Sequence, residues 1–174
     1  MGTAATMSIE ENLALARRRG QRRTLRWGIS NREREEYRRA LAGLELGLED
    51  RMPSKVGLLS GGQRQALTLL MATLQKPEVL LLDEHTAALD PPTARKVLDL
   101  KKTIVASRRL TCMMITHNMQ SALEAGNRTI MMDDGRIVLD VSGEERANMT
   151  VQQLVARFRE TAGRDLAVDR MLLG

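Results

Sequence analysis

The hydrophobic pattern in the middle of the chain predicts a strand–helix–strand unit. Residues 78–82 and 111–116 are short, nearly continuous apolar runs, which is typical of parallel strands buried on both faces. Residues 92–107 between them are predicted to form a helix. Connections of this kind between parallel strands are almost always right-handed. We therefore predict an α/β architecture built around a parallel sheet.

Helical patterns dominate the part of the chain that precedes this unit. Ser8 and Glu11 have the spacing of a capping box, so we expect a helix to begin near residue 9. Apolar residues three or four positions apart predict a second helix over 31–48. A third helix is predicted from Ser60 to about residue 75, because Pro77 disfavours helix in the residue before it.

The pattern after residue 118 predicts a short helix, a β-hairpin and a last helix. The helix over 119–125 is expected to close at Gly126, since glycine is favoured just after a helix ends. Residues 128–141 are predicted to form two strands joined at Asp134-Gly135, a dipeptide typical of tight hairpin turns. A final helix is expected to begin after residue 150 and to run through residue 158.

Composition adds limits to this picture. The chain has 174 residues, of which 43% are hydrophobic and 28% charged, and this is enough for one hydrophobic core. No apolar run approaches the ~18–20 residues that a membrane-spanning helix needs, and no signal-peptide pattern opens the sequence. With a single cysteine there can be no internal disulfide. These observations predict a cytoplasmic protein.

The net charge of +5 comes mostly from arginines crowded between residues 17 and 39. Such a cluster can bind nucleic acid or an anionic membrane surface. It can also form a solvated helical face, in which arginines pair with the interleaved Glu33, Glu35 and Glu36. We favour the second interpretation, with this face near a membrane-embedded partner.

Four residues at the start of the predicted third helix suit a phosphate. Bare backbone N–H groups and the positive end of the helix dipole favour an anion there. Glycines allow close backbone approach, and a serine can both cap the helix and donate to a phosphate oxygen. The four residues are Ser60, Gly61, Gly62 and Gln63.

Two further segments place polar side chains at strand ends. Asp83 and Glu84 follow the first apolar strand, and His117 follows the second. In open α/β sheets, ligands bind in the crevice outside the carboxyl ends of the strands. We therefore expect these side chains to reach one crevice.

These segments, with the turn Ala87-Ala88-Leu89-Asp90, resemble the ATP-binding-cassette (ABC) ATPases. The resemblance covers about residues 6–158. It implies a partial P-loop NTPase (RecA-like) core with parallel strands, an ABC helical subdomain and a C-terminal β-hairpin. It also divides the chain into three regions. A partial helical subdomain covers 1–58, and a tail covers 159–174. Between them, residues 59–158 hold the signature helix and the half of the core with the Walker B motif, at Asp83 and Glu84, and the H-loop, at His117.

The resemblance also implies a role for each candidate residue. Asp83 would hold Mg²⁺, because a hard cation prefers carboxylate oxygens. Glu84 would act as the general base on the attacking water. His117 would contact the terminal phosphate and link it to Glu84, and Asp90 would communicate across a dimer. The signature residues 60–63 would close over an ATP that is seated on the other subunit.

The chain departs from the family pattern in three places. It contains no phosphate-binding loop of the form G-x-x-x-x-G-K-[ST], and no glutamine loop precedes the helical region. Ala88 stands where the family usually has a serine. We therefore expect a truncated form that neither binds nor hydrolyses ATP well alone, and whether the chain is itself an enzyme stays open.

The start at Ser8–Leu13 looks like the importer branch of the family. The implied partners are a transmembrane permease and a second ABC ATPase domain, with ATP and Mg²⁺ as cofactors and a peripheral position on the inner membrane face. No nucleic acid is expected. Two alternatives stay open: a non-enzymatic partner that regulates an intact ABC ATPase, and a soluble ABC ATPase that acts on nucleic acid.

Overall fold

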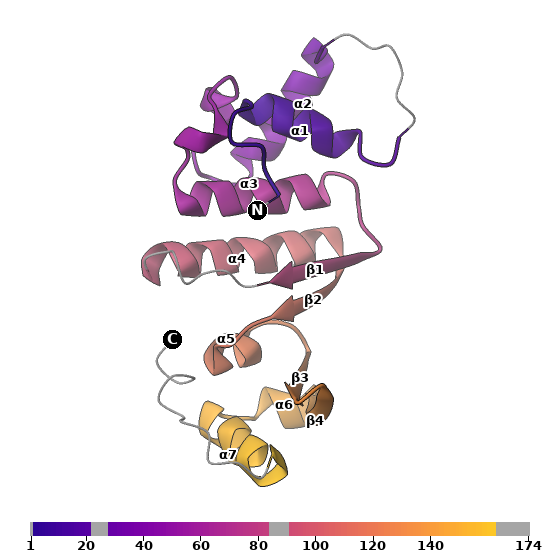
Figure 1. Cartoon of the computed structure of the whole chain (residues 1–174), viewed down its shortest axis with the longest axis vertical. Coiled ribbons are helices and arrows are strands. Elements are labelled where there is room, and N and C mark those ends of the chain that lie inside the picture. Colours follow the sequence, from indigo (N-terminus) through magenta and orange to yellow (C-terminus); the bar gives the residue numbers. More distant parts are fainter. Residues whose placement is uncertain (1, 22–27, 84–90, 163–174) are drawn as a thin grey trace. The chain divides into compact units, whose positions relative to one another are not determined.

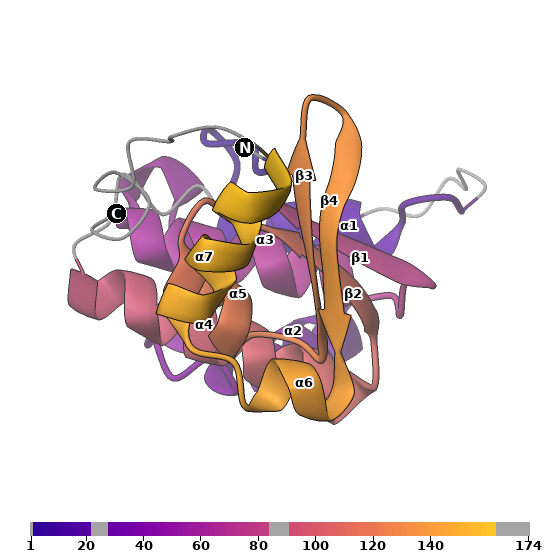
Figure 2. The ribbon, with the colours of Figure 1, turned by 90° about the horizontal axis from the view of Figure 1, so that it is seen from below.

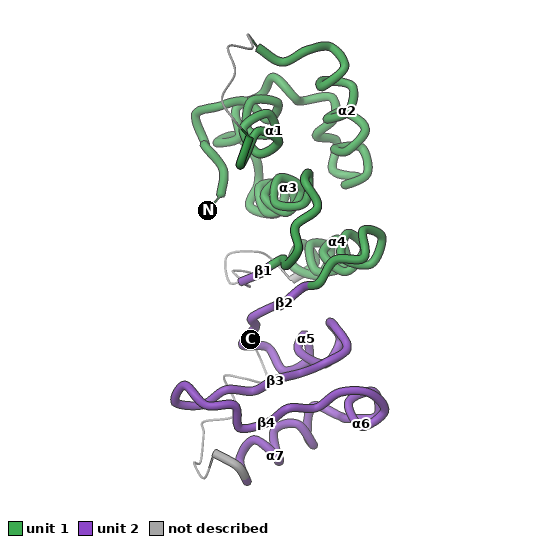
Figure 3. The backbone as a smooth tube through the Cα atoms, turned by 90° about the vertical axis from the view of Figure 1, so that its right-hand side faces the viewer, with its two compact units in different colours: residues 1–80, 88–111 green, residues 81–87, 112–174 purple. Residues whose placement is uncertain are grey.

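The computed structural model describes residues 2–21, 28–83 and 91–162 (Figure 1). The chain forms two compact units, which Figure 3 colours separately. Unit 1 comprises Met1–Leu80 with Ala88–Thr111, and unit 2 comprises Leu81–Ala87 with Cys112–Gly174. Within the described ranges, every helix is too short or too polar to cross a membrane.

Unit 1 is helical, and each of its first three helices begins at a serine. The serine hydroxyl accepts a hydrogen bond from the N–H three residues on, and the residue there bonds back to the serine N–H. This capping box satisfies two N–H groups that a helix start leaves without partners. The helices of the unit are α1 (Ile9–Arg17), α2 (Asn31–Ala42), α3 (Gly61–Thr73) and α4 (Pro91–Arg108), with short 3₁₀ turns η1 (Glu49–Arg51) and η2 (Val56–Leu58).

The helix predicted over 31–48 is shorter than its apolar spacing indicated. α2 ends at Ala42, and the chain then turns through Glu45 and Gly47, which both adopt positive φ. Leu44 and Leu48 are nevertheless buried, as the pattern predicted. The spacing therefore predicted burial correctly, whereas helix could not continue through left-handed backbone.

A buried asparagine fixes the segment that leads into α1. Asn12 is 1% exposed, and its amide bonds to Ala4 N–H at 2.8 Å, to Ala4 C=O at 3.0 Å and to Ser8 C=O at 2.8 Å. The segment so held pairs with the chain just before α3: Gly57 N–H donates to Ala5 C=O at 2.8 Å. Asn12 thus helps to order the approach to α3.

β1 (Val79–Asp83) and β2 (Thr111–Ile115) are hydrogen-bonded neighbours, and the two arrows point the same way in Figure 1. This confirms the strand–helix–strand order and the parallel pair. The prediction that both faces of these strands are buried is wrong, because Leu81 is 71% exposed and Ile115 is 63% exposed. A sheet needs a layer on each face to bury both, and one face of this pair is left open.

Unit 2 closes with the predicted hairpin, seen beside its helices in Figure 2. β3 (Arg128–Asp133) and β4 (Arg136–Ser142) pair antiparallel around Asp134 and Gly135, which both have positive φ as a tight hairpin turn requires. The inner face of the hairpin packs on a core of Met119, Leu154 and Val155. The helices of the unit are α5 (Met119–Glu124), α6 (Gly143–Ala147) and α7 (Val151–Ala162).

Candidate functional site

The start of α3 presents the predicted phosphate-binding residues in a capping box. Ser60 Oγ accepts from Gln63 N–H at 3.2 Å, and Gln63 Oε1 accepts from Ser60 N–H at 3.1 Å. Gln63 Nε2 also donates to Leu46 C=O at 3.4 Å. The Gln63 side chain therefore shapes the helix start, whereas Gly61 and Gly62 contribute the N–H groups that precede the first helical bond.

Charge distinguishes this capping box from the one at α2. There, Glu33 fills the third helical position and its carboxylate accepts from both the N–H and the hydroxyl of Ser30, each at 2.8 Å. At α3 a neutral glutamine replaces the carboxylate, and across the described residues the Ser60 hydroxyl has no acceptor for its proton. The first turn of α3 thus carries no acidic residue and can donate to an anion.

Gly62 has a packing role that the sequence did not reveal. A Cβ at this position would lie 2.4 Å from Thr93 Cγ2 on α4 and 3.8 Å from Val97 Cγ2. Helices that approach this closely leave no room for a methyl group at the contact. Gly62 therefore lets α3 and α4 pack together, and this packing role does not depend on phosphate binding.

The parallel pair of β1 and β2 brings two predicted residues to one sheet edge. Asp83 is the last residue of β1, and His117 lies two residues after the end of β2. Both side chains are exposed. The carboxyl ends of neighbouring parallel strands lie at the same edge, as expected for a crevice of an open α/β sheet.

The backbone around His117 is held on both sides. Asn118 N–H donates to Thr116 Oγ1 at 3.1 Å. The Asn118 side chain then caps α5, because its Oδ1 accepts from Ser121 N–H at 2.9 Å. His117 therefore lies in a short connection whose two flanking residues are bonded to each other, and one of them, Asn118, also caps α5.

Two of the predicted site residues lie outside the described residues. Glu84, the expected general base, and Asp90, the expected dimer contact, both fall in 84–90. Within the ranges that the structure describes, no three His, Cys, Asp or Glu side chains gather as a metal site. This is compatible with Mg²⁺ at Asp83, because Mg²⁺ is commonly bound by one or two carboxylates together with substrate phosphates and water.

Arginines at the end of α1 and on α2 pair with glutamates. Arg17 and Arg32 both contact Glu36, and Arg34 reaches Glu10 on α1 at 3.0 Å. The Arg17 guanidinium holds the pKa of Glu36 below its ordinary value. These contacts favour the solvated, salt-bridged face predicted from the interleaved charges.

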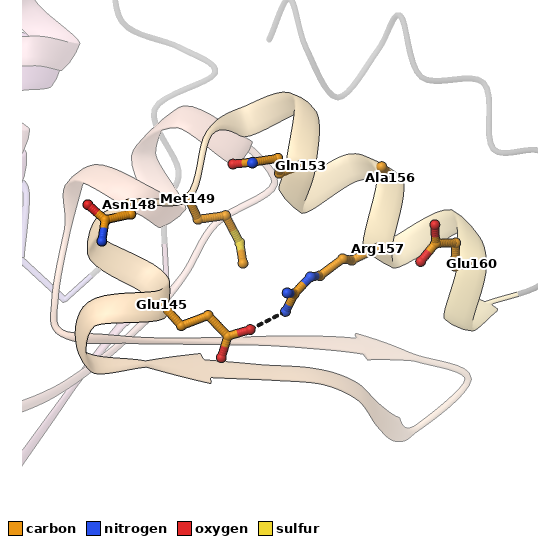
Figure 4. Close-up of a pocket in the computed structure, with 7 residues that line it drawn as sticks. All are labelled: Glu145, Asn148, Met149, Gln153, Ala156, Arg157 and Glu160. Carbon is orange, nitrogen blue, oxygen red and sulfur yellow. Dashed lines mark hydrogen bonds and ion pairs between the residues drawn. The ribbon is translucent and has the colours of Figure 1, made fainter.

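A pocket of about 370 Å³ lies in unit 2 between α6 and α7 (Figure 4). An ion pair between Glu145 and Arg157 crosses it. None of the residues predicted to handle nucleotide lines this pocket. Its lining residues are Glu145, Asn148, Met149, Gln153, Ala156, Arg157 and Glu160.

Comparison with known proteins agrees with the resemblance drawn from the sequence. Residues 3–87 match the family model described as ABC transporter. The tyrosine transport ATP-binding protein of Clostridioides difficile (strain R20291) is 43% identical over 162 residues, which cover 91% of this chain and 62% of that protein. The methionine import ATP-binding protein MetN of Streptococcus thermophilus (strain CNRZ 1066) is 34% identical over 152 residues, covering 87% of this chain and 41% of MetN.

Solved structures show the same fold. An ATP-binding cassette of an ABC transporter, solved in its ADP conformation, superposes with a TM-score of 0.68 at 21% identity. The superposition covers 91% of this chain and 62% of that one. The chain therefore spans less than two thirds of the length of the relatives that it matches.

Proposed function

Because this chain belongs to the ABC transporter ATP-binding family, we propose that it works in ATP-driven import across a membrane. Its import-type relatives support this direction of transport. The single observation that carries the nucleotide part is the neutral capping box at Ser60 and Gln63, which leaves donors and no carboxylate at the start of α3. The transported solute would be selected by a permease.

The start of α3 would donate to the phosphates of an ATP seated on a second ABC ATPase domain. The Ser60 hydroxyl accepts from Gln63 N–H, so its proton is available for a phosphate oxygen. The Gly61 N–H group precedes the first helical bond and adds a second donor. The 174 residues contain no phosphate-binding loop of the usual form, and in this proposal the ATP is held by the loop of the second domain.

At the edge of the parallel pair, the proposed roles are positioning and proton transfer. Glu84 would accept a proton from the attacking water, and His117 would donate to the terminal phosphate oxygen. Asp83 would hold Mg²⁺, which supplies positive charge against the phosphates. Asp90 would contact the second ATPase domain across the dimer.

Outside the nucleotide site, the proposed partners are a transmembrane permease and a second ATPase domain. The protein would then lie on the inner face of the membrane without entering it. The glutamate-paired arginines of α1 and α2 support a solvated surface in that setting rather than a nucleic-acid site.

Titration of the ¹⁵N-labelled chain with millimolar Mg-ATP tests the nucleotide part of the proposal. We expect weak binding that shifts the amide signals of Gly61, Gly62 and Gln63 first. Serine-to-alanine substitution at position 60 should abolish these shifts, whereas Ser30→Ala should leave them. Micromolar affinity, or shifts confined to other segments, would show that the phosphates are held elsewhere.

A further inference from the structure

The guanidinium group of Arg146 on α6 forms hydrogen bonds with both the end of α5 and the start of β3. Its Nη2 lies within hydrogen-bonding distance of three C=O groups, those of Ala125 at 2.6 Å, Leu123 at 2.8 Å and Ala122 at 3.2 Å, so one of its two N–H groups is shared between two of them. Its Nε donates to Thr129 Oγ1 at 2.8 Å. One side chain thus closes the last turn of a helix that is 21 to 24 residues away in the sequence.

The hydroxyl of Thr129 completes this arrangement. Thr129 is 5% exposed, and its Oγ1 donates to Ala122 C=O at 2.9 Å while it accepts from Arg146. The hydroxyl therefore uses its donor and an acceptor site in the same cluster. Hydrogen bonds from a charged donor are stronger than those between neutral groups.

α5 depends on such contacts because it is short. It has six residues, whereas isolated helices below about 12 residues are marginal in water. Its last C=O groups have no partners within the helix, and a cation there also matches the negative end of the helix dipole. Apart from Arg146 and the Thr129 hydroxyl, α5 is held by Met119 and Leu123, which pack in the hydrophobic cluster of unit 2.

The other end of α5 leads directly to His117. Asn118 caps the helix through its side chain and donates its N–H to Thr116 Oγ1, so His117 lies between two residues that are bonded to each other, one of which is the N-cap of α5. Any rotation or fraying of α5 would loosen this cap and change the direction of the imidazole. Arg146 acts on the opposite end of the same helix.

We infer that Arg146 is a positioning residue for His117, which it orients by fixing the C-terminal end of α5. The role that this gives to Arg146 rests on the proposed function, in which His117 donates to the terminal phosphate. The guanidinium fork is needed, because it reaches three carbonyl groups and a hydroxyl at once. A lysine ammonium has the charge but not the planar, forked donor geometry.

The experiment follows the His117 imidazole signals by NMR in the nucleotide-free chain. The chain has two histidines, so the variant His117→Asn assigns the signals. We expect Arg146→Ala and Arg146→Lys to shift or broaden the His117 signals. Arg157→Ala, which removes the surface ion pair with Glu145, is the matched control and should leave them unchanged.

Amide hydrogen exchange distinguishes positioning from general stability. Arg146→Ala should speed exchange of the α5 amides at least about tenfold, given the strength of hydrogen bonds from a charged donor. Exchange within the β3–β4 hairpin should stay near its original rate. Thr129→Val, which removes the shared hydroxyl at nearly constant volume, should act on α5 and His117 in the same direction.

Three outcomes would overturn the inference. They are unchanged His117 signals in Arg146→Ala, full retention of the native signals in Arg146→Lys, and an equal loss of protection throughout unit 2. Because these readouts need no ATP, their failure is separate from failure of the Mg-ATP titration, which tests the proposed function.

Discussion

At the scale of single residues, helix starts that look alike in the sequence differ in charge. Ser30 is tied to a glutamate carboxylate, whereas Ser60 is tied to the neutral amide of Gln63. Each pair satisfies the same backbone N–H groups. The amide leaves the start of α3 suitable for an anion, and the carboxylate makes the start of α2 unsuitable.

Replacing either serine by alanine should therefore lower the unfolding free energy by a similar amount, whereas only the replacement of Ser60 should weaken the binding of Mg-ATP. Ser60→Ala and Ser30→Ala each remove a capping acceptor, which is worth about 1 kcal/mol of unfolding free energy. Urea denaturation should show similar losses in the two variants. A loss for Ser60→Ala far below that for Ser30→Ala would mean that the Ser60 cap contributes little to the fold.

The contact at Gly62 gives a second prediction at this scale. Gly62→Ala places a methyl group 2.4 Å from Thr93 Cγ2, and overpacking of this kind typically costs about 1–3 kcal/mol. Thr93→Ser removes that methyl carbon and keeps the hydroxyl, so the double variant should recover most of the lost stability. Thermal melting of the four proteins measures the coupling, and simple additivity would contradict the assigned contact.

The sequence predicted the cap at Ser60 but not the packing at Gly62. A serine followed three residues later by glutamine is a local pattern, so spacing alone reveals it. The neighbour of Gly62 is Thr93, 31 positions further along the chain, and no periodicity indicates that contact. Likewise, Arg146 shows no signal in the sequence, because its partners lie in other elements.

At the scale of elements, ion pairs join α1 to α2. Glu36 on α2 forms ion pairs with Arg17 on α1 and with Arg32 on its own helix. The hydrogen bond from Arg17 lowers the pKa of the Glu36 carboxyl group. Sequence spacing suggested pairs within one helix but could not show which helices meet. Periodicity similarly predicted that Leu44 and Leu48 are buried while it overestimated the length of α2.

The pairing of α1 with α2 should make part of the stability depend on pH and salt. A carboxylate whose folded pKa is lowered stabilises the fold above its unfolded pKa, which is ordinarily 4.5 here, and this contribution is lost as pH falls through the folded pKa. Glu36→Gln should therefore be less stable than the original chain at pH 7 and equal to it in strong acid. Urea midpoints at several pH values measure this.

High salt should narrow the stability difference at pH 7, because both side chains of the Arg17–Glu36 pair are partly exposed. The variant Asp50→Asn is a suitable control, since it alters an exposed acidic residue of η1 and should show no such dependence. A Glu36→Gln difference that persists below pH 3 would assign the effect to packing rather than to charge.

At the scale of the whole chain, apolar side chains lie on the open face of the β1–β2 pair. Leu81, Met113 and Ile115 are each more than half exposed. The continuous apolar runs led to the prediction of two buried faces, and the exposed side chains are the residues that made those runs continuous. The hydrophobic pattern indicates which side chains a strand could bury, whereas only one face of the β1–β2 pair is covered here.

This open face should make the isolated chain bind hydrophobic dyes and associate with itself. Ile115→Lys should weaken dye fluorescence and concentration-dependent association measured by ultracentrifugation, because exposed apolar patches drive both. Leu15→Lys changes a side chain that is also 55% exposed but belongs to α1 and not to the sheet. Equal effects of the two substitutions would show that association does not use the sheet.

The bonds of Arg146 also bear on the order in which the chain folds. A chain emerging from the ribosome presents α5 before residue 146 exists, so the last carbonyls of that helix stay hydrated until α6 follows. Hydrophobic contacts of Met119 and Leu123 with α7 form later still, since α7 begins at Val151. The connection that carries His117 would therefore be among the last parts to acquire its final conformation during synthesis.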